Sequence, residues 1–214
     1  FDAATLLRIA ELRGEAMAEL GSPTGAMLAV AAPWQQVQKI LDGKAATIVG
    51  FNSPRQTVVA GDAGHVAEVA QAAESRGWRV TMLPVSRAFH TPLVAAAVPV
   101  LAEELANLTF APLQRHVVST ILGESLCGGE DLRELLCRQV TSPVRFMAAL
   151  MALPGSVDLL IEAGPGRVLS GLVGETVDLP VVSLDAGGDS LRGLLQGVGA
   201  AFALGAPVRH DDLA

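Results

Sequence analysis

The chain begins with a helical pattern and continues with short apolar runs. Between Phe1 and Leu20, apolar residues recur at the spacing of a helix, and the turn residues of Gly21–Gly25 end it. Runs typical of strands follow at Ala26–Ala32, Ala45–Asn52, Gln56–Gly61 and Trp78–Pro84, with helical patterns at Trp34–Leu41 and, after the capping residue Asp62, at His65–Ser75. The order β-α-β-β-α-β predicts a ferredoxin-like unit inserted between helical segments.

Strands and helices alternate through the rest of the chain. The pattern predicts helices at Thr91–Asn107, Glu130–Val140, Pro143–Leu153, Arg167–Glu175 and Ser190–Leu204, and strands at His116–Ile121, Val157–Ala163 and Pro180–Leu184. Such alternation is typical of an α/β fold with a mainly parallel sheet and helices on both faces. We therefore expect an inserted subdomain at residues 26–87, within a larger subdomain formed by residues 1–25 and 88–214.

Composition and charge exclude several classes of function. Half of the 214 residues are apolar and 17% are charged, as in a folded domain with a large core. The formal charge of −7 argues against nucleic-acid binding, which needs a basic surface. We expect a cytoplasmic protein, because no apolar run is long enough to span a membrane and no secretion signal is present. The first residue is not Met, which indicates that the chain begins inside a longer polypeptide.

Cysteines and histidines give no metal site. Cys127 and Cys137 are too few for a disulfide framework and are expected to be reduced thiols. Zinc needs about four clustered ligands, and the four histidines are scattered along the chain. Three of them have no partner pattern and are interpreted as structural or surface residues: His65, His116 and His210.

His90 and Arg13 are the candidates for chemistry. His90 lies where a strand gives way to a helix, a place where α/β proteins build sites, and its ring can act as a general base near neutral pH. The alternative is a histidine whose hydrogen bonds are satisfied within its loop. Arg13 could bind a carboxylate with two parallel bonds, although position alone favours a surface salt bridge with Glu11 or Glu15.

Two glycine-rich turns resemble known motifs without matching them. Gly164-Pro165-Gly166 follows a strand, but Leu169 stands where a dinucleotide-binding loop has its third glycine, so we interpret it as a tight turn. The segment Gly123–Cys127 differs from a nucleophile elbow because Cys127 replaces the second glycine. Ser125 is therefore rejected as a nucleophile.

Several segments, in order along nearly the whole chain, resemble the malonyl-CoA:acyl-carrier-protein transacylase family, which includes the acyltransferase domains of polyketide and fatty acid synthases. The similar segments are Arg13–Met17, Gly25–Met27, Asn52–Gly61, Ala88–Pro92, Gln139–Phe146 and Glu162–Leu169. The resemblance implies an α/β-hydrolase-like large subdomain with a partial, mainly parallel sheet, and an inserted ferredoxin-like small subdomain. It also implies transfer of a malonyl group from malonyl-CoA to an acyl carrier protein through a serine ester, without a metal or redox cofactor.

The resemblance assigns roles to four residues. His90 would be the general base, and Arg13 would pair with the free carboxylate of the malonyl group. Gln139 would hold the histidine ring through its backbone carbonyl, and Phe89 would crowd an α-methyl branch, which favours malonyl over methylmalonyl. Carrier proteins are usually acidic, so a basic rim is expected, with Arg76, Arg79 and Arg87 as candidates.

The chain also departs from the family pattern. Arg87 replaces the first histidine of the His-Ala-Phe-His segment of malonyl-selective domains, and Thr91 is similar to iterative synthases of the enediyne and polyunsaturated fatty acid type, where modular synthases mostly have Ser. The Gly-His-Ser-x-Gly elbow is absent, and we expect it upstream of Phe1, in a polypeptide with flanking synthase domains. Three alternatives stay open: an inactive module that docks carrier proteins, a ligand-sensing domain built on the small subdomain, and selectivity for methylmalonyl or another acyl group.

Overall fold

The structure is a computed structural model that describes residues 2–85, 87–187 and 190–209. It divides into two compact units, Phe1–Ala152 and Leu153–Ala214, which are considered one at a time. Phe1 and His210, which the sequence interpretation names, lie outside the described residues. Among the described residues, no helix is long and apolar enough to cross a membrane.

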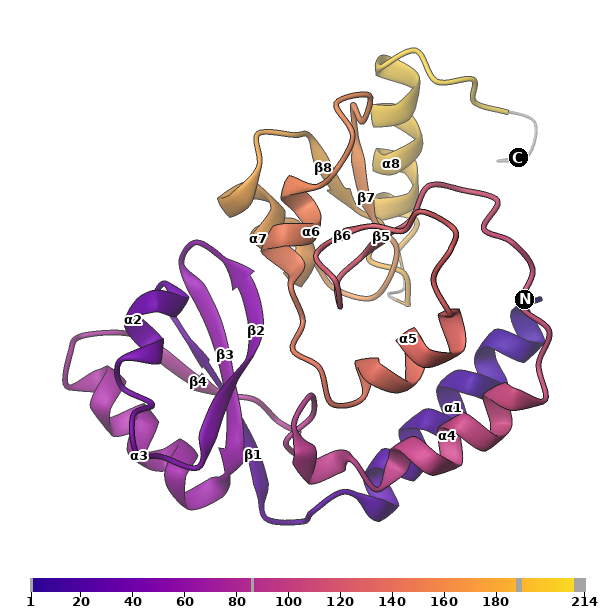
Figure 1. Ribbon diagram of the computed structural model, residues 1–214. Coiled ribbons are helices and arrows are strands. Elements are labelled where there is room, and N and C mark those ends of the chain that lie inside the picture. The colour runs from indigo at the N-terminus through magenta and orange to yellow at the C-terminus, as the bar shows by residue number, and fades with distance from the viewer. Residues whose placement is uncertain (1, 86, 188–189, 210–214) are drawn as a thin grey trace. The chain divides into compact units, whose positions relative to one another are not determined.

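A four-stranded antiparallel sheet forms part of the first unit (Figure 1). Its strands are β1 (Gly25–Val30), β2 (Ala46–Ser53), β3 (Gln56–Asp62) and β4 (Val80–Met82), in the order β2-β3-β1-β4. The register places Leu28 opposite Val59 on one side and Met82 on the other. This order confirms the predicted ferredoxin-like arrangement.

Each face of this sheet is packed against a different part of the chain. One face carries Leu28, Val30 and Val59 and is covered by α2 (Trp34–Gln38) and α3 (Ala63–Glu74) (Figure 1). The other face carries residues from β1, β2 and β3 and packs against the segment that leaves β4: Met27, Val49, Val58 and Ala60 against Ala88, Phe89 and Leu93. Because neighbouring residues of a strand point to opposite faces, the sheet separates its helical layer from the segment that contains His90.

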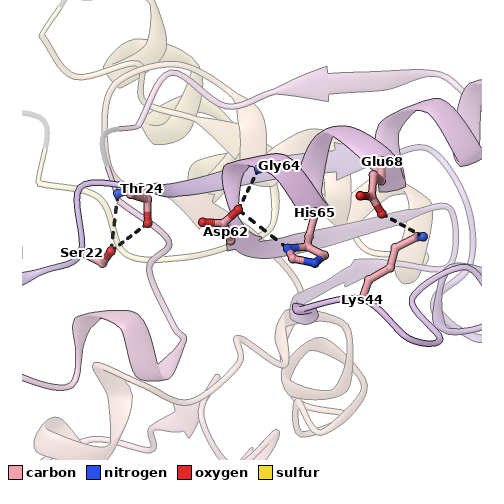
Figure 2. Close-up of polar contacts among 7 residues, drawn as sticks. All are labelled: Ser22, Thr24, Lys44, Asp62, Gly64, His65 and Glu68. Carbon is pink, nitrogen blue, oxygen red and sulfur yellow. Dashed lines mark hydrogen bonds and ion pairs between the residues drawn. The ribbon is translucent and has the colours of Figure 1, made fainter.

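Polar side chains fix the ends of the elements in the small sheet. Asp62 begins α3 as predicted: its Oδ1 accepts a hydrogen bond from the backbone N–H of Gly64 at 3.0 Å, and His65 lies 3.7 Å from the same oxygen (Figure 2). Lys44 binds Glu68 of α3 at 3.2 Å (Figure 2). The helix predicted at Trp34–Leu41 is shorter than expected, because bonds from residue i+3, such as Ile40 N–H to Val37 C=O, tighten the chain into a turn after Gln38.

Two long helices of the first unit lie side by side, α1 (Ala3–Leu20) and α4 (Ala97–Ala106) (Figure 1). The prediction of one continuous helix over Thr91–Asn107 is wrong. A short 3₁₀ helix, η1 (Pro92–Val94), precedes α4. Pro99 lacks an N–H group and cannot bond to the carbonyl of residue 95, so it is tolerated only in the first turn of a new helix.

The rest of the first unit contains a small hairpin and two helices. The hairpin pairs β5 (Val118–Ser119) with β6 (Glu124–Ser125), so the strand predicted at His116–Ile121 is much shorter than expected. The hydroxyl of Ser119 accepts hydrogen bonds from the N–H groups of Ile121 and Leu122, which turns the chain. The helices are α5 (Leu132–Gln139) and α6 (Phe146–Met151), and the segment between them forms a parallel bridge from Val144 to Gly50 of β2.

The second unit contains a parallel pair of strands, β7 (Leu160–Glu162) and β8 (Val181–Ser183), with the helices α7 (Val168–Thr176) and α8 (Arg192–Ala203). In the described part of the chain, parallel pairing is limited to these strands and the bridge at Gly50. The predicted α/β class is therefore confirmed with a partial sheet. The subdomain boundaries at residues 26–87 and 88–214 stay predictions, since the compact units divide the chain at a different place.

Candidate active site

The turn that contains His90 has an unusual backbone conformation. His90 has a φ of 63°, in the left-handed region that residues other than glycine seldom adopt. Ala88, two residues earlier, is fully buried beneath the start of β1. There Gly25 is required, because a Cβ atom at that position would lie 2.5 Å from the backbone nitrogen of Ala88. The sheet and the turn are therefore in direct backbone contact.

The His90 ring is held by the end of a distant helix. Its Nδ1 lies 3.0 Å from the backbone carbonyl oxygen of Gln139, the last residue of α5. The carbonyls of the last helical turn have no partner within the helix, so this oxygen is free to accept a bond. A carbonyl can only accept, so Nδ1 donates and the neutral ring keeps its lone pair on Nε2. The structure thus brings together two residues that the sequence analysis selected.

The surroundings of His90 favour its neutral form. Burial lowers the pKa of His90 from its ordinary value of 6.5, and the positive charge of Arg13 lowers it further. The backbone groups of Gln139 and Ser142 act in the opposite direction, because they stabilise the protonated ring. The net direction is downward, so the ring is available as a base at neutral pH.

Arg13 lies on α1 and is half-buried. Its Nε atom is buried and has no hydrogen-bond partner among the described residues, and burial lowers the pKa of Arg13. The alternative of a salt bridge with Glu11 or Glu15 finds no support in the part of the chain that the structure describes. Arg8, one turn earlier on the same helix, pairs with Glu104 at 2.6 Å. A buried donor without a partner is costly, and a ligand carboxylate would supply the missing acceptor.

Phe89 is half-buried and packs against two apolar clusters. One lies on the face of the sheet opposite α2 and α3 and includes Met27 and Val49. The other lies between α1 and α4 and includes Met17. Its ring therefore connects the sheet to the helix that carries Arg13. The four predicted site residues come from α1, the turn after β4 and the end of α5, and their catalytic and binding roles stay predictions.

The other candidates do not form sites among the described residues. Two N–H groups in the first turn of α7, those of Leu169 and Ser170, already donate to the carboxylate of Glu162 at 3.0 and 2.8 Å and are not free for a phosphate. Ser125 lies in the hairpin strand β6, not at a strand-to-helix junction. No group of three or more histidine, cysteine or acidic side chains there is arranged to bind a metal. A cavity of about 500 Å³ has an apolar lining that includes Leu132 and Leu136 of α5 but none of the four predicted site residues.

Sequence reasoning missed three features of this site. These are the left-handed backbone of His90, the contribution of Ser142, and the burial of the Thr91 hydroxyl. The contribution of Ser142 joins segments far apart in the sequence, and the hydrophobic pattern carries no signal for a single backbone angle or for the burial of one hydroxyl.

Comparison with known proteins gives one consistent family. Residues 2–186 match the family model described as acyl transferase domain. The malonyl CoA-acyl carrier protein transacylase of Escherichia coli (strain K12) is 36% identical over 186 residues, 83% of this chain and 60% of that protein. Polyketide synthase GfsB of Streptomyces halstedii is 36% identical over 161 residues, 72% of this chain and 3% of that protein.

Solved structures agree with these relatives. The acyltransferase domain of the iterative polyketide synthase in enediyne biosynthesis has a TM-score of 0.89 and 40% identity, and the match covers 96% of this chain and 54% of that one. A malonyl-transacylase in complex with a type II polyketide synthase acyl-carrier protein has a TM-score of 0.75 and 28% identity, over 91% of this chain and 64% of that one. The chain thus spans little more than half of the enediyne-synthase domain.

Proposed function

Because the chain belongs to the acyl transferase domain family, we propose that it supplies the general base and the carboxylate-binding residue of a malonyl transferase. The reaction moves a malonyl group from malonyl-CoA to the phosphopantetheine thiol of an acyl carrier protein. The observation that carries this proposal is a His90 ring with Nε2 left free by its bond to Gln139, in the electrostatic range of an Arg13 whose buried Nε has no partner. Transfer of a malonyl group needs a base to activate the nucleophile and a cation to bind the free carboxylate. The charge of Arg13 also lowers the pKa of His90, which keeps the base neutral.

The nucleophile of this reaction lies on a segment outside this chain. Ser125 is in a hairpin, and the chain spans 60% of the length of the Escherichia coli transacylase. In the relatives, the remaining part of the domain has no counterpart here. We infer that a serine from that part is placed against Nε2 of His90, the nitrogen that the bond to Gln139 leaves free.

The proposed transfer has two steps. In the first, Nε2 of His90 takes the proton of the serine hydroxyl while the serine oxygen bonds to the thioester carbon of the malonyl group. The carbon–sulfur bond then breaks, and the departing CoA thiolate receives the proton from His90. In the second step the carrier thiol gives its proton to His90 and its sulfur bonds to the same carbon. The serine ester breaks, and the proton returns to the serine oxygen.

Arg13 gives the reaction its preference for a half-acid. The malonyl carboxylate accepts hydrogen bonds from the guanidinium, whereas an acetyl group leaves the buried Nε without a partner. Phe89, packed against two clusters, restricts the space beside the acyl group, which favours malonyl over methylmalonyl. No metal or redox cofactor takes part in these steps.

The proposed partners are malonyl-CoA, an acyl carrier protein, the remaining part of the same domain and flanking synthase domains. The similarity to the enediyne-synthase domain supports a role in an iterative polyketide pathway, and the similarity to the transacylase in complex with its carrier protein supports the carrier as partner. A cytoplasmic location stays a proposal. Arg76 and Arg79 are exposed and suit a rim that contacts an acidic carrier. Arg87 is half-buried and donates a hydrogen bond to the carbonyl of Ala18, so we assign it to the fold instead.

Loading of malonyl and acetyl groups by the complete domain tests this function. Arg13→Ala should depress malonyl loading by about 10- to 100-fold, the effect of losing a charge-assisted pair of roughly 1.5–3 kcal/mol, and leave acetyl loading almost unchanged. The matched control is Arg8→Ala, because Arg8 lies on the same helix with an exposed side chain. Equal loss of both substrates in Arg13→Ala would refute the carboxylate-binding role, and a wild-type domain that loads neither would refute the transferase.

A further inference from the structure

The left-handed backbone of His90 requires support from its neighbours. With φ at 63°, the residue has a conformation that an L-amino acid keeps only where the surrounding contacts enforce it. The bond from the ring to Gln139 fixes the imidazole, but it does not fix the backbone from which the ring extends. A second interaction has to act on the main chain around residue 90.

The hydroxyl of Thr91 provides such an interaction. Its Oγ1 donates to the carbonyl oxygen of Ala88 at 2.6 Å and accepts from the N–H group of Leu93 at 3.2 Å. Ala88 and Leu93 lie on either side of His90 in the chain, so one hydroxyl closes the turn from both directions. Thr91 is 2% exposed, and water therefore cannot easily replace it.

We propose that Thr91 is a positioning residue that holds the His90 ring against the Gln139 carbonyl, with Nε2 directed outward for proton transfer. Its hydroxyl acts through His90 and does not contact the substrate. The consequence for the reaction rests on the function proposed above, whereas the effect on the ring does not. Serine carries the same hydroxyl, so Thr91→Ser should preserve the turn, while Thr91→Val keeps the shape and removes both hydrogen bonds.

A matched control exists in the small sheet. Thr57 is fully buried, and its hydroxyl donates to the carbonyl of Ala32 at 2.9 Å. Thr57→Val removes a buried threonine hydroxyl away from the turn, so it reports the general effect of that loss. A difference between Thr91→Val and Thr57→Val is then specific to His90.

The first experiment follows the ring itself by ¹⁵N NMR in the complete domain. The wild type, Thr91→Ser and Thr57→Val should show His90 with its proton on Nδ1. In Thr91→Val the signal should move toward the mixture of tautomers of a free imidazole. If Thr91→Val keeps the Nδ1–H form, the proposal is overturned whether or not the domain transfers malonyl.

The second experiment measures transfer kinetics. Thr91→Val should lower kcat by on the order of 10-fold with little change in KM, because a misplaced base slows proton transfer without weakening substrate binding. Thr91→Ser should stay near the wild type, and so should Thr57→Val when rates are expressed per folded molecule. Equal kcat in Thr91→Val and Thr57→Val would overturn the proposal, while an inactive wild type would count against the transferase alone.

Discussion

The interior of the small sheet and the site around His90 differ in what their functional side-chain groups bind. In the sheet, the buried hydroxyl of Thr57 is bonded to a carbonyl, and the strands pair in an antiparallel ladder whose register shifts twice along β2. At the turn, the bond to Gln139 uses one ring nitrogen of His90, and Arg13 keeps a buried Nε without a partner. The hydroxyl in the sheet is therefore satisfied within the fold, whereas the Nε of Arg13 and the lone pair on Nε2 of His90 are left for a ligand.

This difference separates stability from function within one compact unit. Buried groups that are already paired contribute to folding, and their loss should affect the free energy of unfolding. Groups left without partners cost stability and are retained where a ligand completes them. Substitutions in the two regions should therefore have effects that differ in kind.

Removal of the base should have the largest effect. His90→Ala is expected to lower the rate of covalent labelling by malonyl-CoA by roughly 10²- to 10⁴-fold, the usual contribution of a general base. Labelling of the complete domain with radioactive malonyl-CoA measures this loss. The matched control is His65→Ala, a histidine of the small sheet region whose ring is partly exposed beside Asp62.

His65→Ala should label at the wild-type rate. Normal labelling of His90→Ala would exclude His90 as the base. A similar loss in both variants would instead mean that the two regions are not functionally distinct.

A cavity in the sheet should have the next largest effect, on stability. Leu28 of β1 is fully buried between the strands and the helices α2 and α3, so Leu28→Ala should lower the free energy of unfolding by about 2–5 kcal/mol. Denaturant titration measures the loss, and labelling per folded molecule should stay close to wild type. A strong loss of activity in well-folded protein would show that the sheet also shapes the site.

The sheet was predictable from the sequence because its determinants are local. Apolar runs of strand length, the turn between β2 and β3 and the Asp62 cap all lie within a few residues of the elements that they define. The order of these elements then limits the topology, since few arrangements connect β-α-β-β-α-β without crossing. Prediction was weaker where elements are short, as in the two-residue strand β5, because a strand exists only where it finds a partner.

The sequence could name candidate site residues but not their geometry. His90 was selected by its place after a strand, whereas the roles of Arg13, Phe89 and Gln139 came from resemblance to a family and stay predictions. The contact between His90 and Gln139 joins residues 49 positions apart, and it uses a main-chain oxygen that residue identity does not reveal. The φ of His90 and the unpartnered Nε of Arg13 likewise follow from packing.

The pH dependence should show a smaller effect. Burial and the charge of Arg13 lower the pKa of His90, so the midpoint at which protonation of His90 inhibits transfer should lie below pH 6.5. Activity should be full above this value and fall about tenfold per pH unit once the pH is below the lowered pKa. The folded state binds fewer protons than the unfolded chain between the two pKa values, so stability should rise with pH across the same window.

Initial rates of acyl transfer from pH 5 to 8 measure the acid limb. A midpoint above 6.5 would mean that the opposing carbonyls outweigh burial. Arg13→Gln should move the midpoint upward, because it removes the positive charge that acts on the ring.

The smallest effect is expected at Gln139, and it tests how the ring is held. The backbone oxygen of residue 139 binds Nδ1 of His90, so Gln139→Ala keeps the bond, and alanine also suits the end of α5. Transfer rates should stay within about 2-fold of wild type, a difference below roughly 0.5 kcal/mol. A loss above about 10-fold, or 1.4 kcal/mol, would require a direct role for the side chain. Unchanged transfer rates would mean that the backbone carbonyl at the end of α5 is sufficient to hold the His90 ring. Position 139 would then be essential to the geometry of the site although its side chain is not.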